Sequence, residues 1–179
     1  MASTPSTLGV VEDHYVAYHD ERVGWFRHKS VEHTITYLDW TIDGRPLREL
    51  VRYVDGSVPR EVTVLQNDWS ALGVGRSLLN SLLGLPARGG FDVAMPDGRI
   101  ALLFCPTCFD LCCATLTTEV EISDSYVEWR DIAWQVGYDP LDLTDSEFDP
   151  PTLTFDRARY EAELNRLLNL ERARLSGGV

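Results

Sequence analysis

The sequence predicts an α+β fold, in which an antiparallel sheet of about five to seven strands is packed by three helices, the last of them C-terminal. Residues 114–122 alternate apolar and polar side chains, as a half-buried strand does. The continuous apolar run 100–104 precedes this strand, and the aromatic-rich segment 126–134 follows it. We therefore expect three consecutive strands to form a meander. Residues 156–175 carry apolar side chains at helical spacing and predict the C-terminal helix.

Three further segments favour strands. Residues 31–42 are rich in β-branched and aromatic types, and residues 61–66 alternate apolar and polar side chains. In the segment 8–30, the valines and tyrosines near its start suggest one strand, and the triplet 24–26 suggests another.

Two shorter helices are predicted between these strands. After Pro46, which suits a first helical position, apolar residues recur at i, i+3, i+4 and i+7. Leucines 78, 79, 82 and 83 form the apolar face of a helix over 70–83, which Gly84 closes. Thr154 or Asp156 is the candidate N-cap of the C-terminal helix.

The length of 179 residues suits one domain, which we expect over 8–175, with flexible tails at 1–7 and 176–179. A formal charge of −12 disfavours binding to nucleic acid and to anionic membranes. No apolar run approaches the ~20 residues of a membrane span, and the N-terminus lacks the pattern of a signal peptide. We therefore expect a cytoplasmic protein with reduced thiols.

All four cysteines lie in the stretch FCPTCFDLCCA, residues 104–114. The spacing Cys105-x2-Cys108 is the half-site of zinc ribbons and knuckles. Cys112 and Cys113 are adjacent and lead into a strand, so their side chains should point to opposite faces. We expect Cys113 to turn toward the pair and Cys112 to be a buried thiol. The sequence thus predicts a Zn²⁺ site with Cys105, Cys108 and Cys113 as ligands.

The fourth ligand of such a site stays open. The candidates are a water, a residue of a second subunit, and His14, His19, His28, His33 or Asp110. Asp110 is alternatively expected to accept backbone N–H bonds within the turn.

Two other interpretations of the cysteine turn compete with zinc. It can be a packed turn without metal, because cysteine is among the most buried residue types. It can instead carry thiol redox or nucleophilic chemistry, but its neighbours Phe104, Phe109 and Asp110 are apolar or acidic and raise the pKa of a thiol.

The segment that begins at Gly98 resembles an uncharacterised actinobacterial family of small proteins. In that family a strand leads into a CPxCGDLGCG-like motif, and a VxWRDFGW-like hairpin segment follows. The cysteines matched are Cys105, Cys108 and Cys113, while Phe109, Cys112 and Ala114 stand where the pattern has glycine. Segments like VDGRPLREL and FDRxxYExxL match at 42–50 and 155–164. The resemblance implies a related fold and no particular activity.

These observations favour a noncatalytic cytosolic interaction or accessory protein with a protein partner, whose cysteine turn is a structural element that holds zinc or packs without it. The alternative is an enzyme that uses Cys105, Cys108 and Cys113 in thiol redox or metal-assisted chemistry. A further alternative is an acidic antagonist of a basic or nucleic-acid-binding partner. Neither a GxSxG nor an HExxH motif occurs. An exposed subset of the five tryptophans would indicate a binding surface.

Overall fold

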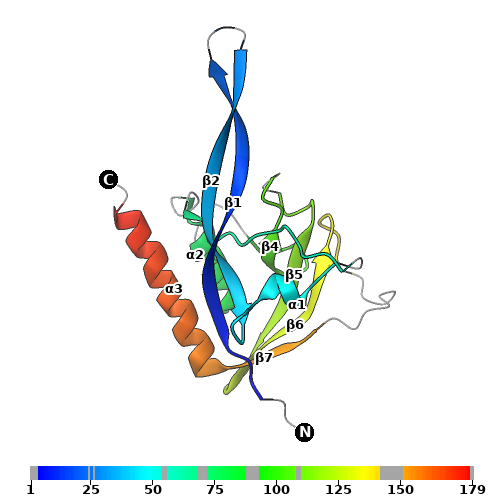
Figure 1. Cartoon of the computed structure of the whole chain (residues 1–179). Coiled ribbons are helices and arrows are strands. Elements are labelled where there is room, and N and C mark those ends of the chain that lie inside the picture. Colours follow the sequence, from blue (N-terminus) through cyan, green and yellow to red (C-terminus); the bar gives the residue numbers. More distant parts are fainter. Residues whose placement is uncertain are drawn as a thin grey trace.

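We analysed a computed structural model of the chain (Figure 1). The structure describes residues 4–23, 25, 27–53, 56–67, 72–87, 93–107, 110–141 and 151–177. In these ranges the elements, in chain order, are β1 (Leu8–Val23), β2 (Arg27–Ile42), β3 (Arg45–Pro46), α1 (Leu47–Leu50), α2 (Val74–Leu82), β4 (Ile100–Phe104), β5 (Thr115–Ile122), β6 (Tyr126–Gln135), β7 (Leu153–Asp156) and α3 (Arg157–Gly177). The α+β class and the C-terminal helix are confirmed. The strands form two antiparallel sheets in place of one.

The larger sheet has the order β4-β5-β6-β7 and contains the predicted meander. Its strand β7 was not predicted from the sequence. The β5–β6 register shifts between Thr117 and Glu119, and Asp131 opposite has φ 49°. Thr115 and Thr117, expected on the outer face of β5, are fully buried. The hydroxyl of Thr115 donates to the carbonyl of Leu111 at 2.7 Å, so burial leaves its donor satisfied.

The smaller sheet is dominated by the hairpin of β1 and β2, which are 16 residues each and pair without a break from Leu8–Ile42 to Val23–Arg27. Of the strand expected over 24–26, Gly24 and Phe26 lie outside the described residues, and Trp25 lies in a turn between β1 and β2. A pattern of a few aromatic residues does not distinguish a strand from the turn of a hairpin.

Residues 61–66 are buried but do not form the predicted strand. The segment makes one isolated bridge to each sheet, Val62 to Phe104 and Gln66 to Tyr37. It therefore crosses between the sheets and follows neither. The first helix is also shorter than predicted, because α1 ends at Leu50 after a single turn.

The two sheets and α3 share one aromatic core. Trp129 of β6 meets the edge of Trp40 of β2 at a centroid distance of 5.9 Å, and Phe155 at 5.2 Å. Its indole Nε1 donates to the hydroxyl of Tyr160 on α3 at 2.9 Å. Trp129 therefore joins three parts of the fold.

Hydrogen bonds hold the N-terminal segment and the start of α3. The amide of Ser6, within the expected N-terminal tail, donates to the carbonyl of Thr154 at 2.7 Å. Asp156 caps α3 as predicted, because its Oδ1 accepts from the amide of Arg159 at 3.0 Å. Over the described ranges, no helix combines the length and apolar character needed to cross a membrane.

Candidate functional site

The outer part of the β1–β2 hairpin projects from the rest of the molecule, as the blue ribbon of Figure 1 shows. Near its base, the hydroxyl of Tyr15 donates to Gln66 Oε1 at 3.1 Å, and Ile35 on the paired strand is buried. We name residues 16–34, beyond these contacts, the arm. At about 3.3 Å per residue, its two strands reach roughly 25 Å outward.

The arm exposes large side chains. Tyr18 is 69% exposed and Trp25 is 81% exposed, and Val16 lies on the same face of the ribbon as Tyr18. A two-stranded ribbon without a third layer is marginally stable on its own in water. The arm therefore needs contacts at its base that hold it in one orientation.

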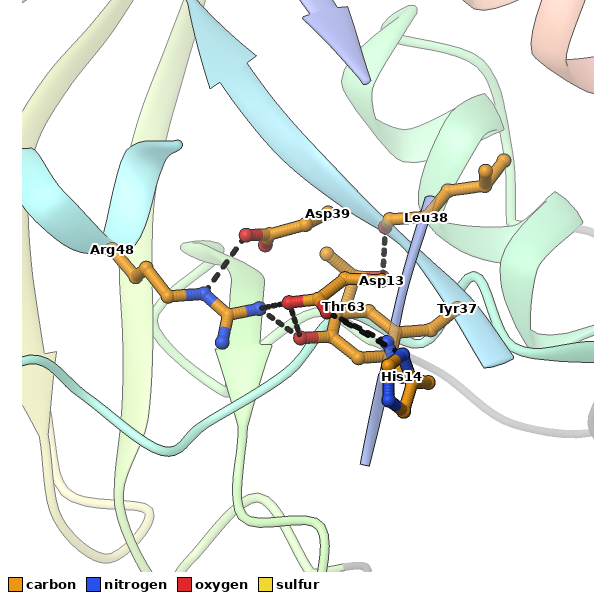
Figure 2. Close-up of polar contacts among 7 residues, drawn as sticks. All are labelled: Asp13, His14, Tyr37, Leu38, Asp39, Arg48 and Thr63. Atoms are coloured by element: carbon orange, nitrogen blue, oxygen red, sulfur yellow. Dashed lines mark hydrogen bonds and ion pairs between the residues drawn. The ribbon is translucent and has the colours of Figure 1, made fainter. Parts of the chain in front are cut away.

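Four polar side chains supply that base, and we call them the anchor network: Asp13, Tyr37, Asp39 and Arg48 (Figure 2). Arg48 Nε on α1 donates to Asp39 Oδ2 on β2 at 2.8 Å, and its Nη2 donates to the hydroxyl of Tyr37. That hydroxyl donates in turn to Asp13 Oδ2 on β1 at 3.0 Å. One guanidinium thus joins both strands of the hairpin to α1.

The centre of the anchor network is buried. Asp39 is 1% exposed, and among the described residues its Oδ1 has no hydrogen-bond partner. Burial raises the pKa of Asp39, although the nearby Arg48 lowers it. Burial likewise raises the pKa of Tyr37. The charge of Asp39 is therefore tolerated only because Arg48 lies against it.

Backbone contacts extend this base. The hydroxyl of Thr63 donates to the carbonyl of Leu38 at 2.6 Å (Figure 2), and the amide of Leu38 donates to the carbonyl of Leu65 at 3.0 Å. Leu38 lies between Tyr37 and Asp39 on β2. The segment 61–66 and α1 thus both fix the strand that carries two members of the anchor network.

The anchor network was not predicted from the sequence. The signal that could have indicated it is Asp39, a carboxylate placed between the large apolar residues Leu38 and Trp40 of the predicted strand 31–42. A charge in that position requires a cationic partner. Arg48 follows nine residues later, on the first turn after the strand.

The cysteine turn connects β4 to β5, as expected. Cys105 and Cys112 are half-buried and Cys113 is exposed, whereas Cys108 lies outside the described residues, as does Phe109. Cys112 and Ala114, two of the positions where the resembling family has glycine, do not have positive φ. Among the residues that the structure describes, no three His, Cys, Asp or Glu side chains are grouped so that they could hold a metal. The zinc site of Cys105, Cys108 and Cys113 stays a prediction.

Asp110 closes the cysteine turn. Its Oδ1 accepts a hydrogen bond from the amide of Cys112 at 2.9 Å, which confirms the expected backbone contact, and another from the hydroxyl of Tyr138 at 2.7 Å. The amide of Gly137 donates to the carbonyl of Cys112 at 2.8 Å. These contacts fix the turn against the segment after β6.

The contact between Asp110 and Tyr138 predicts a measurable titration. The hydrogen bond to Asp110 raises the pKa of Tyr138 to about 12. Because the folded pKa exceeds the ordinary value, this contact stabilises the fold below pH 10 and ceases to do so as the pH rises through 12. Substituting Asp110→Asn should bring the Tyr138 pKa back toward 10, measured by NMR of ring-labelled tyrosine. An unchanged Tyr138 pKa in the variant would contradict this contact.

In comparisons with known proteins, no family model, no curated protein and no solved structure matches the chain. A function therefore has to be inferred from the arm, its anchor network and the cysteine turn.

Proposed function

We propose that the protein is a noncatalytic cytoplasmic interaction protein that presents its arm to a protein partner. The observation that carries this proposal is the exposure of Tyr18 and Trp25 on a hairpin that projects beyond the body. Tyrosine and tryptophan dominate the residues that contribute most to binding in protein interfaces. The anchor network supports the same proposal, because it gives the arm a fixed direction.

The charge of the arm favours a protein over a nucleic acid or a membrane. The arm contains three acidic residues (Asp20, Glu21, Glu32) and three basic ones (Arg22, Arg27, Lys29), so its formal charge is zero while the whole chain carries −12. A neutral ribbon has no attraction for phosphate groups. Its strand edges can add a strand of the partner by backbone hydrogen bonds.

The arm is tested by comparing the wild-type chain with the double variant Tyr18→Ser, Trp25→Ser as baits in extract of the native cells. Truncating an interface hot spot costs about 2 kcal/mol or more, so we expect the recovery of the bound protein to fall at least tenfold. Val136→Ser is the matched control, because Val136 is 72% exposed on the body.

Two outcomes would contradict this role. The first is equal recovery of the same protein by the wild type and the arm variant. The second is an equal loss in the Val136→Ser control. Circular dichroism and thermal unfolding must be alike for all three baits, so that a loss of binding is not a loss of folding.

The cysteine turn enters the proposal as a structural element, with Zn²⁺ held by Cys105, Cys108 and Cys113. The resemblance to the actinobacterial family with the CPxCGDLGCG-like motif supports this assignment, as does the closure of the turn by Asp110. Elemental analysis of protein purified without chelator tests it. One zinc per chain, removed only with unfolding, is the expected result, and metal-free folded protein is the contrary one.

A further inference from the structure

An open cavity of about 580 Å³ lies against the four-stranded sheet, between the end of α2, the turn before β4, and β5. Its apolar lining comes from Ile100, Val120, Ile122 and Leu141. Its charged lining comes from Arg99, Asp97 and Glu119. None of these residues belongs to the anchor network or to the arm.

Among the described residues, Arg99 is a buried cation without an ion pair. It is 7% exposed, and none of the described carboxylates lies within 4.0 Å of its guanidinium. Its Nε donates to Thr117 Oγ1 at 2.9 Å, and its Nη2 donates to the carbonyls of Thr117 and Asp131. All three acceptors are uncharged, and over the described ranges Nη1 has no acceptor. By contrast, Arg48 lies 2.8 Å from a carboxylate.

The carboxylate of Asp97 accepts the amide of Arg99 through Oδ1 at 3.2 Å, and its other oxygen is held by groups other than the guanidinium. Asp97 Oδ2 accepts from Gln135 Nε2 at 3.1 Å and from the amide of Leu141 at 3.2 Å. Glu119 is exposed. Burial lowers the pKa of Arg99, and the charges of Asp97, Asp131 and Glu119 oppose this without reversing it. The positive charge of Arg99 is thus incompletely compensated.

A purely structural role accounts for only part of this arrangement. The β5–β6 register shift leaves carbonyls at Thr117 and Asp131 that Arg99 Nε and Nη2 satisfy. That role needs neither Nη1 nor a cavity beside the guanidinium. A buried, incompletely compensated cation at the wall of a cavity with an apolar side is the arrangement that a small anion with an apolar part would fit.

We propose that this cavity binds a small organic carboxylate, with its carboxylate on Arg99 Nη1 and its carbon chain against Ile100, Val120 and Ile122. A single negative charge suits the site better than a phosphate, because the carboxylates of Asp97 and Glu119 line the same cavity and repel a doubly charged group more strongly. This inference is independent of the arm.

The test uses methyl NMR of the full chain titrated with acetate, hexanoate, succinate and glutamate, with hexan-1-ol and inorganic phosphate as controls. At least one carboxylate should give saturable shifts of the Ile100, Val120 and Ile122 methyl groups. Hexan-1-ol and phosphate should bind at least tenfold more weakly. The proposal fails if none of the four carboxylates saturates, or if hexan-1-ol matches the best of them.

Two variants locate the binding. Arg99→Met should weaken the best carboxylate at least tenfold, but Arg99 also supports the β5–β6 register and its loss can perturb the fold. Val120→Trp therefore serves as a second variant, because it fills the cavity and leaves Arg99 in place. Val136→Trp, on the exposed surface, is the control for the added indole. Unchanged carboxylate binding in Val120→Trp would overturn the proposal.

Discussion

The substitution Arg48→Met is expected to lower the free energy of unfolding by about 3–5 kcal/mol, because it leaves a buried carboxylate without its cation. Asp39 is 1% exposed and lies 2.8 Å from Arg48 Nε. Methionine retains most of the apolar stem of the side chain, so the loss reports on the charge and its hydrogen bonds. Urea unfolding at pH 7, followed by circular dichroism, measures the change.

The loss of stability in Arg48→Met should depend on pH in a defined direction. Burial already raises the pKa of Asp39, and removing Arg48 removes an effect that lowers it. The folded pKa of Asp39 then lies further above its unfolded value. The free-energy penalty of the unpaired carboxylate is therefore complete above the folded pKa, and it disappears as the pH falls toward the unfolded pKa. The difference in stability between the wild type and the variant should therefore narrow as the pH is lowered from 7.

A second substitution separates the effect of the unpaired carboxylate from other causes of the lost stability. Asp39→Asn in the Arg48→Met background removes the uncompensated charge, and it should recover at least half of the lost stability at pH 7. A double variant as unstable as Arg48→Met alone would show that the loss has another origin. So would a loss that does not change with pH.

The substitution Trp129→Ala is expected to have an effect of similar or larger size. Trp129 is fully buried and contacts Trp40, Phe155 and Tyr160. Removing a core tryptophan costs about 3–5 kcal/mol, partly through the cavity left behind. Because whole domains are stable by only about 5–15 kcal/mol, the variant should be close to unfolding at 37 °C.

Trp129→Phe is the matched control for the core. It keeps an aromatic ring, and it removes the Nε1 donor to Tyr160 and part of the ring volume. The hydroxyl of Tyr160 still donates to the carbonyl of Leu82 at 3.1 Å, so no buried donor is left unpaired there. We expect this variant to lose about 1–2 kcal/mol. Equal losses for phenylalanine and alanine would contradict the packing role.

The sequence predicted the elements whose pattern is local. The meander β4-β5-β6 and the helix α3 follow from alternation and helical spacing. Residues 61–66 alternate like a strand, but they form only one bridge to each sheet, to Phe104 near one end and to Tyr37 at the other. Tertiary contacts of this kind leave no periodic signal. The length of the β1–β2 hairpin was missed because its exposed outer half lacks a buried face.

The candidate site was predicted less well than the fold. The spacing of the cysteines indicated a candidate site in the turn after β4, because these reactive side chains are close together in the sequence. The anchor network joins Asp13, Asp39 and Arg48 from three elements, so only their proximity in space reveals it. Exposure of Tyr18 and Trp25 could not be inferred either, because aromatic residues in strands are more often buried.

The most direct test of the account is to place a photoreactive phenylalanine analogue at Tyr18 in the otherwise wild-type chain and irradiate the native cells. The account predicts a covalent adduct with one protein partner from position 18, and none with that partner when the analogue replaces the exposed Val136. Absence of any adduct at position 18, or the same adduct from both positions, would contradict the assignment of the arm as the binding element.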